Sequence, residues 1–372
     1  MEDSERSRAL AVELLRISRP QDGRIPFSQF MEVVLYAPQW GYYGRPQVFG
    51  PAGDFQTAPR IHPVFGATVA REAVREWERL DRPKGFTFIE LGAGEGMLTR
   101  DVVRSVHETI GEAVQGWNVL LIDRFPRDQK APDPEWAVAP KWSRSLEGVP
   151  AGPGVAIANE LLDALPFHIL ERTAKGWEER WVRVEGSSGG AAHLGWETGP
   201  LSEPGLDSIL PQSAPEGTVA EVTTHYRALF AQLARVLEEG EALFFDYGDS
   251  RDGLLERMPR GTMETFRHHA AGTSPLENLG GTDIGCWVDF TQAGREAAET
   301  GWEVESLTSQ GQALHDWGMD EVVRGFQARD PVEGVRAHLA RKAYHFGYAD
   351  HRVLRLRRAR RVREPFSAAR TR

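Results

Sequence analysis

The sequence FTFIELGAGEGML, at residues 86–98, sets the arrangement that we expect for the rest of the chain. Residues 86–89 are aromatic or β-branched, and the run 86–90 predicts an interior strand that ends at Glu90. Three glycines follow, alternating with Ala93 and Glu95, and apolar positions at helical spacing resume from Met97. A strand, a glycine turn and a helix form the geometry in which a ligand lies against bare backbone at a helix N-terminus.

The glycine pattern discriminates between ligands. A nicotinamide fingerprint needs a third glycine where Met97 stands, and a phosphate-binding P-loop needs a Gly-Lys-Ser/Thr sequence that does not follow here. The carboxylate of Glu90, at the end of the strand, is unfavourable beside a pyrophosphate and suits a cationic ligand. The stretch therefore favours S-adenosylmethionine as cofactor, against the alternative of a purely structural turn. The expected cofactor-binding residues are Glu90, Gly92, Ala93, Gly94 and Gly96.

Composition narrows the protein class. The chain has 372 residues, 41% of them apolar, which allows two domains or one domain with large additions. No apolar run approaches the ~20 residues of a membrane helix. The acidic start differs from a secretory signal or transit peptide, and the single Cys286 fits a reducing compartment, so we expect a cytoplasmic protein. A net charge of −10 disfavours broad nucleic-acid binding, and no paired His or Cys spacing supports a metal site.

Strands and helices alternate along the chain, as in an open, mostly parallel, doubly wound α/β sheet. We expect a helical segment over residues 1–82, a Rossmann-like core over 83–320 and a C-terminal extension over 321–372. Residues 176–184 predict half of a hairpin, and an irregular insertion is expected around 185–218. Residues 351–363 hold seven arginines, which predict a solvated basic tail, with a nucleic-acid or partner-binding patch as the alternative. The expected strands are 86–90, 119–123, 155–160, 242–248 and 302–307, and the expected helices are 8–17, a short one capped by Ser28, 65–80, one from Met97, 228–237 and 291–300.

Four expected strands end in polar residues, and ligands of such sheets bind beyond the carboxyl ends of the strands. These residues are Glu90, Asp123, Asn159 with Glu160, and Asp246. An acid at Asp123 can accept both ribose hydroxyls of an adenosyl group. For each acid alone, an ordinary loop carboxylate is the alternative, and their coincidence at successive strand ends favours a site.

Residues 159–166, NELLDALP, carry the second candidate function. One interpretation is a helix N-terminus capped by Asn159, with acids in its first turn. The other is a site that orients a planar guanidinium, because carboxylates bind guanidinium through paired, charge-assisted hydrogen bonds. Glu160 is the first candidate for this catalytic role and Asp163 is the second.

Together with other motifs in the same order, these stretches resemble the MidA-type methyltransferase family, which includes a mitochondrial assembly factor for respiratory NADH dehydrogenase. The resemblance implies a class I methyltransferase fold, S-adenosylmethionine as cofactor and arginine methylation of a protein, with a respiratory complex subunit as a candidate partner. It covers about three quarters of the chain. The matching motifs are L-Y-x-P-x-x-G-Y-Y (35–43), G-D-F-x-T-A-P (53–59), E-L-G-x-G-x-G (90–96), N-E-x-x-D-A-L-P (159–166), D-Y-G (246–248), R-x-H (267–269), V-D-F (288–290) and Q-G (310–311).

The chain departs from this pattern at several positions. Arg60 replaces an acid, Gly285 and Trp287 replace Thr and His, and residues 123–126 read DRFP where Glu-x-Ser-Pro is usual. The acceptor could therefore be another protein or a small molecule, and a catalytically idle scaffold or a nucleotide-dependent oxidoreductase are further alternatives. The aromatic residues of 36–43 could frame a cation or simply pack. Candidate substrate or lid residues are Tyr43, Asp54, Thr57, Asp246 and His269, and Asn159 is a further candidate for cofactor binding.

Overall fold

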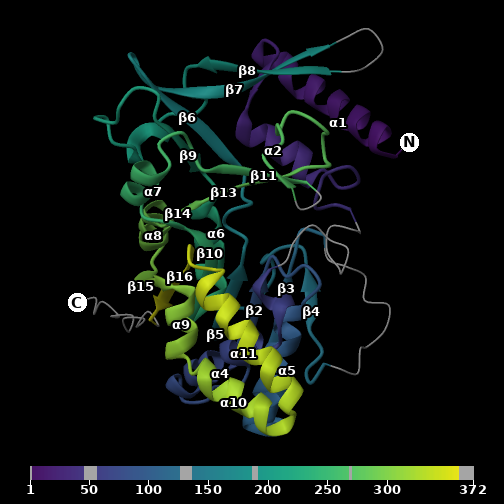
Figure 1. Cartoon of the computed structure of the whole chain (residues 1–372), viewed down its shortest axis with the longest axis vertical. Helices are drawn as coiled ribbons and strands as arrows, with labels where there is room; N and C mark the ends of the chain where they lie inside the picture. Colours follow the sequence, from purple (N-terminus) through teal and green to yellow (C-terminus); the bar gives the residue numbers. More distant parts are fainter. Residues whose placement is uncertain (1, 46–56, 126–135, 187–191, 268–269, 360–372) are drawn as a thin grey trace, which may run out of the picture.

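A computed structural model of the chain describes residues 2–45, 57–125, 136–186, 192–267 and 270–359 (Figure 1). Its larger sheet has the order β15-β16-β10-β5-β2-β3-β4, with β14 paired to the end of β10. The strands from β10 to β4 are parallel neighbours, and β16 runs antiparallel to both β10 and β15. The doubly wound, mostly parallel sheet is thus confirmed. The strands are β2 (Thr87–Leu91), β3 (Asn118–Ile122), β4 (Lys141–Ser143), β5 (Gly152–Asn159), β10 (Leu237–Asp249), β14 (Val288–Asp289), β15 (Glu303–Ser309) and β16 (His351–Arg358).

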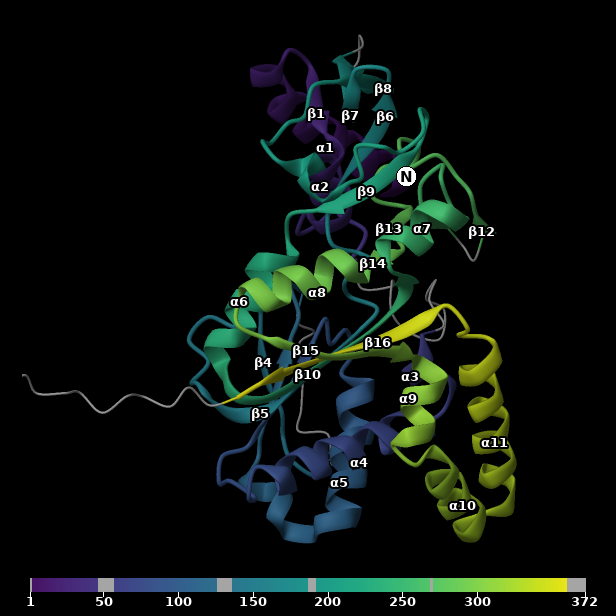
Figure 2. The ribbon, with the colours of Figure 1, turned by 90° about the vertical axis from the view of Figure 1, so that its left-hand side faces the viewer.

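Helices cover both faces of this sheet (Figure 2). One face packs against α4, α5, α9, α10 and α11, and the other against α6 and α8. Successive residues of a strand point to opposite faces, so Phe245 joins the first core and Phe244 the second. These helices are α4 (Val64–Arg79), α5 (Met97–Ile110), α6 (Tyr226–Val236), α8 (Phe290–Glu299), α9 (Gln310–Asp316), α10 (Met319–Arg329) and α11 (Pro331–Phe346).

A second, antiparallel sheet lies at the end of the molecule opposite α4, α5 and α10 (Figures 1 and 2). It is formed by β1 (Arg24–Pro26), β6 (Phe167–Thr173), β7 (Gly176–Gly186), β8 (Ala192–Gly199) and β9 (Val219–Thr223). Helices α1 (Glu2–Ser18) and α2 (Phe27–Tyr36) cover it and share its apolar core. The remaining elements are η1 (Arg19–Gln21), α3 (Ala58–Ile61), η2 (Gly111–Gly116), η3 (Leu206–Ile209), α7 (Arg251–Arg257), β11 (Met263–Arg267), β12 (Ala270–Ala271) and β13 (Asp283–Cys286).

The five expected strands and the longer expected helices are present, and two expectations are wrong in detail. The short helix α2 begins at Phe27, with Pro26 rather than Ser28 at the cap position. The 185–218 segment is not irregular throughout, because β8 pairs with β7 over eight residues. Several strands have no counterpart among the expected ones, among them β4, β6 and β9. A division of the chain at residues 82 and 320 stays a prediction.

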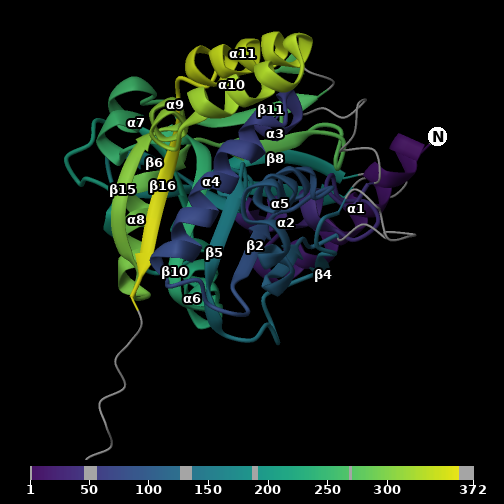
Figure 3. The ribbon, with the colours of Figure 1, turned by 90° about the horizontal axis from the view of Figure 1, so that it is seen from below.

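The largest correction concerns the arginine-rich segment. Residues 351–358 form β16, an interior strand that lies between β15 and β10 (Figure 3), so the prediction of a solvated tail is wrong for them. The apolar residues Val353, Leu354 and Leu356 of β16 are buried, and Arg355 and Arg357 pair with carboxylates of neighbouring elements. Arg355 Nη2 lies 2.5 Å from Oε2 of the fully buried Glu241. Arg355 and Arg357 thus neutralise carboxylates that lie within the sheet and on the helix packed against it.

Among the described helices, none combines the length and apolar character that crossing a bilayer requires.

Candidate active site

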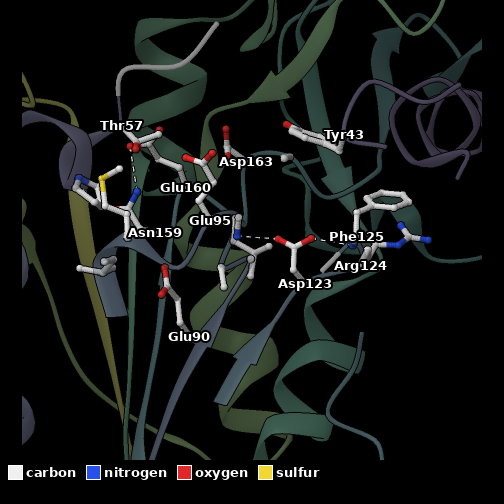
Figure 4. Close-up of a pocket in the computed structure, with 18 of the residues that line it drawn as sticks. Tyr43, Thr57, Glu90, Glu95, Asp123, Arg124, Phe125, Asn159, Glu160 and Asp163 are labelled. Atoms are coloured by element: carbon white, nitrogen blue, oxygen red, sulfur yellow. Dashed lines mark hydrogen bonds between the residues drawn. The ribbon is translucent and has the colours of Figure 1, made fainter. Parts of the chain in front are cut away.

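A cavity of about 210 Å³ lies at the carboxyl ends of β2, β3 and β5, where segments around α2 and α3 cover them (Figure 4). It brings together most of the residues expected from the sequence. Those that line it are Tyr43, Thr57, Glu90, Gly92, Ala93, Gly94, Asp123, Asn159, Glu160 and Asp163. Gly96 and Asp246 do not line it, and Asp54 and His269 lie outside the described residues.

The glycine loop between β2 and α5 needs glycine for its backbone. Gly92, Gly94 and Gly96 have φ angles of +68°, +54° and +71°, a region that L-residues with a side chain rarely adopt. A Cβ at Gly92 would lie 3.0 Å from Leu161 Cδ1, and one at Gly96 would lie 2.8 Å from Leu121 Cδ1. Both Gly92 and Gly96 thus permit close packing of the turn, and Gly92 and Gly94 also present bare backbone to the cavity.

Asp123 ties two loops of the cavity together. Its Oδ2 accepts a hydrogen bond from the Gly94 backbone N–H at 2.9 Å, and its Oδ1 accepts one from Phe125 at 2.8 Å (Figure 4). A carboxylate oxygen can accept more than one hydrogen bond, so both atoms retain capacity for a ligand hydroxyl.

Glu90 is a buried carboxyl at the floor of the cavity. Its Oε2 accepts hydrogen bonds from the Thr99 backbone N–H, at 3.1 Å, and from the Thr99 hydroxyl. Burial nevertheless dominates and raises the pKa of Glu90 to about 8. A cationic ligand in the cavity would favour the ionised form.

Glu160 follows β5 in a left-handed conformation, with φ +51°. Its side-chain Oε1 accepts a hydrogen bond from Asn159 Nδ2 at 3.3 Å, and no helix begins here, so the capped-helix alternative is wrong. Burial and the nearby Asp163 carboxylate raise the pKa of Glu160 to about 7. A non-glycine residue at positive φ is strained, and such strain is concentrated at functional sites.

Asp163 is the second carboxyl of this loop. Its Oδ2 accepts a hydrogen bond from the Tyr247 hydroxyl at 2.9 Å. Its buried Oδ1 makes no well-formed hydrogen bond within the described residues. The Tyr247 hydroxyl and the Ala164 backbone N–H favour ionisation, yet burial outweighs them and raises the pKa of Asp163 to about 6.

Asp246 lies beneath the 160–163 loop and accepts hydrogen bonds from its backbone. It is fully buried, and its Oδ2 accepts hydrogen bonds from the backbone N–H groups of Leu161, Leu162 and Asp163 at 2.9–3.3 Å. The structure therefore places Asp246 under the 160–163 loop, where it positions the two cavity carboxyls, and not at the substrate surface expected from the sequence.

Aromatic side chains close the other end of the cavity. The rings of Tyr36 and Tyr43 stack with centroids 5.3 Å apart, and the Tyr43 hydroxyl donates to Asp283 Oδ1 at 2.7 Å. The Arg124 guanidinium lies over the Tyr36 ring, 4.5 Å from its centroid. Tyr42 is buried in the core of the second sheet and packs there.

Arg60 and Arg124 also line the cavity and were not expected there from the sequence, although both stand at departures from the family motifs. Among the described residues the lining is acidic, with five carboxyls against these two guanidiniums. Such a lining, beside a bare glycine cradle and an acid suited to ribose, fits a cationic adenosyl ligand. In the described part of the chain no group of three or more His, Cys, Asp or Glu residues is arranged to hold a metal ion.

Comparison with known proteins gives a family match over residues 68–308, to the family described as "Putative S-adenosyl-L-methionine-dependent methyltransferase". A mitochondrial protein arginine methyltransferase NDUFAF7 homolog from Drosophila melanogaster is 29% identical over 310 residues, which cover 77% of this chain and 69% of the relative. Protein arginine methyltransferase NDUFAF7 from Xenopus tropicalis, also mitochondrial, is 28% identical over 80% of this chain and 73% of its own. A crystal structure from Burkholderia thailandensis, bound to S-adenosyl-homocysteine, superposes with a TM-score of 0.84 at 27% identity, covering 96% of this chain and 93% of that one.

Proposed function

The chain belongs to this family of S-adenosyl-L-methionine-dependent methyltransferases, and we propose that its methyl acceptor is an arginine side chain of a protein. Family membership confirms the enzyme class, the cofactor and the MidA-type resemblance expected from the sequence. The names of the relatives support a protein arginine as acceptor, and the carboxyls of the 160–163 loop support it independently.

The glycine cradle and the strand-end acids would hold the cofactor. Gly92 and Gly94 offer bare backbone, Asp123 offers acceptors for ribose hydroxyls, and Glu90 offers a negative charge to a cationic ligand. When bound, the cofactor supplies an electrophilic methyl group on a sulfonium centre.

The observation that carries the acceptor proposal is the pair of buried carboxyls on one loop of the cavity. A guanidinium is planar, carries five N–H donors and matches carboxylates through its fork. Asp163 Oδ1 has no well-formed hydrogen bond within the described residues, and Glu160 is shielded from water. A guanidinium would stabilise both carboxylates, because it supplies hydrogen-bond donors and positive charge.

Binding in this way would fix the plane of the guanidinium and direct one nitrogen towards the methyl group. Orientation of this kind supplies much of the rate of a transfer between two bound groups. The reacting nitrogen must also lose a proton. Glu160, whose pKa lies at about 7, can accept that proton at neutral pH.

Glu160→Gln tests the proposal, because the amide keeps the shape of the side chain and removes its charge. Wild type and variant are incubated with methyl-labelled S-adenosylmethionine and cell lysate, and labelled products are identified by mass spectrometry after hydrolysis. We expect methylarginine from the wild type and a loss on the order of 100-fold or more in the variant. Cofactor affinity, measured by calorimetry, should persist in Glu160→Gln.

Other outcomes would redirect the function. Label on a small molecule would replace the protein acceptor, and absence of label across varied lysates, with cofactor still bound, would favour an idle scaffold. The resemblance to an assembly factor makes a subunit of respiratory NADH dehydrogenase the first protein acceptor to assay. The relatives are named as mitochondrial. For this chain we propose a cytoplasmic location, because a single cysteine fits a reducing compartment. Cell fractionation would test this location.

A further inference from the structure

Arg60 occupies a position in the cavity that the general reaction scheme does not explain. It lies on α3 and lines the cavity beside the glycine loop. Its Nη2 donates a hydrogen bond to Glu95 Oε2 at 2.6 Å, and Glu95 belongs to that loop. The Arg60 side chain is only 18% exposed, so the pair holds a guanidinium at the wall of the cavity.

Charge within the cavity makes this guanidinium significant. Five described lining residues carry carboxyls, and two carry a positive charge, Arg60 and Arg124. S-adenosylmethionine has a sulfonium and an ammonium group, which suit the acids, and also an α-carboxylate. That carboxylate would be repelled by the lining unless a cation received it.

Arg124 is committed elsewhere. Both of its terminal nitrogens bind the Glu32 carboxylate, and its guanidinium lies over the Tyr36 ring. Arg124 directly follows Asp123, and Figure 4 shows it on the side of Asp123 away from Asn159 and Glu160. It therefore stands at the end expected to bind the adenosyl group, and not at the methionyl end.

We propose that Arg60 binds the α-carboxylate of S-adenosylmethionine and that Glu95 positions its guanidinium. An arginine fork matches a carboxylate with two parallel hydrogen bonds, and the hydrogen bond from Arg60 to Glu95 engages one terminal nitrogen. The family pattern has an acid at this position, so the chain recognises the methionyl end with a residue of its own. The inference rests on the cofactor dependence of the family and is independent of the methyl acceptor.

The test compares two ligands that differ in this carboxylate, S-adenosylmethionine and its decarboxylated analogue, by titration calorimetry without any acceptor. Wild type should prefer S-adenosylmethionine by about 10- to 100-fold, the usual effect of a charge-assisted hydrogen-bonded pair. Arg60→Gln should lose this preference and keep its affinity for the analogue within about threefold. Arg60→Lys, which keeps the charge without the fork, should lie between them.

Arg124→Gln is the matched control, because it removes the other guanidinium of the cavity. Its preference ratio should equal that of the wild type, whatever happens to its absolute affinities. The assignment is overturned if wild type shows no preference, if Arg60→Gln weakens both ligands equally, or if Arg124→Gln abolishes the preference. Circular dichroism melting verifies folding, and should Arg60→Gln not fold, a preference ratio in Arg60→Lys equal to that of the wild type would overturn the assignment. Since no acceptor is present, failure of arginine methylation would leave this result unaffected.

Discussion

The substitution Glu90→Gln separates two effects of the buried Glu90 carboxyl, one on the stability of the protein and one on cofactor binding. Glu90 is 5% exposed, and its Oε2 accepts both hydrogen bonds from Thr99. A glutamine oxygen can accept the same two bonds, so the substitution changes charge with little change in contacts. We expect the variant to be more stable than wild type at alkaline pH and weaker in cofactor binding.

The magnitude follows from the pKa of Glu90, which burial raises from 4.5 to about 8. The folded state then binds more protons than the unfolded state between these values, so the free energy of unfolding falls as pH rises through this window. At about 1.4 kcal/mol for each pKa unit, the Glu90 carboxyl lowers the free energy of unfolding by under about 1 kcal/mol at pH 5 and by about 4 kcal/mol at pH 8. The stability difference between variant and wild type should therefore grow by about 3 kcal/mol over this range.

Urea unfolding, followed by tryptophan fluorescence at pH 5, 6.5 and 8, measures this difference. Groups remote from Glu90 titrate equally in both proteins, and their contributions cancel in the comparison. A difference that stays constant or shrinks with pH would refute the desolvation argument. Calorimetry in buffers of different ionisation enthalpy provides a second readout: a cationic ligand should release a proton from wild-type Glu90 near neutral pH, and Glu90→Gln should show no such release from this site.

Three further predictions concern the same cavity. Gly94→Val forces a branched residue to φ +54°, which costs about 1–3 kcal/mol of strain, so the loop should change shape. S-adenosylmethionine binding should then disappear in a protein that circular dichroism shows to be folded. Retained affinity would contradict the role of Gly94 in cofactor binding. Asp123→Ala should weaken cofactor binding by about 2 kcal/mol and Asp123→Asn by less, whereas equal wild-type affinity for 2′-deoxy and normal cofactor would exclude a ribose contact. The kcat/KM for the acceptor should rise with pH up to about 7, as Glu160 ionises, and Asp163→Asn should move this rise to lower pH because the Asp163 carboxylate raises the pKa of Glu160; a pH–rate profile that Asp163→Asn leaves unmoved would contradict the coupling.

Much of the main sheet was predictable because its strands carry local signals. The apolar run of β2 and the three glycines that follow specify a strand, a turn and a helix without reference to distant residues. Strand β16 lacks such a signal. In the sequence its arginines resemble a solvated tail, because the carboxylates that pair with them are distant along the chain. Arg355 pairs with Glu72, 283 residues away. The three-residue strand β4 is too short to show any periodicity.

The cavity was predictable to a similar extent. Acids at strand ends were expected to meet, and they do, since parallel strands bring their carboxyl ends to one edge. Which acid faces the ligand was not predictable, because it depends on the path of residues 160–166. The left-handed bend at Glu160 turns Asp163 into the lining and leaves Asp246 beneath the loop as an acceptor of three backbone N–H groups.

One departure from the family motifs lies directly beside a candidate catalytic carboxyl. Where the pattern has threonine, this chain has Gly285, and a Cβ there would lie 2.9 Å from the Tyr247 hydroxyl and 3.2 Å from Asp163 Oδ2. Those two atoms form the hydrogen bond that holds Asp163 in the cavity. The absence of a side chain at Gly285 leaves room for this hydrogen bond, which orients a candidate catalytic carboxyl. We therefore expect Gly285→Thr to disturb this hydrogen bond, to impair methyl transfer and to leave cofactor affinity unchanged.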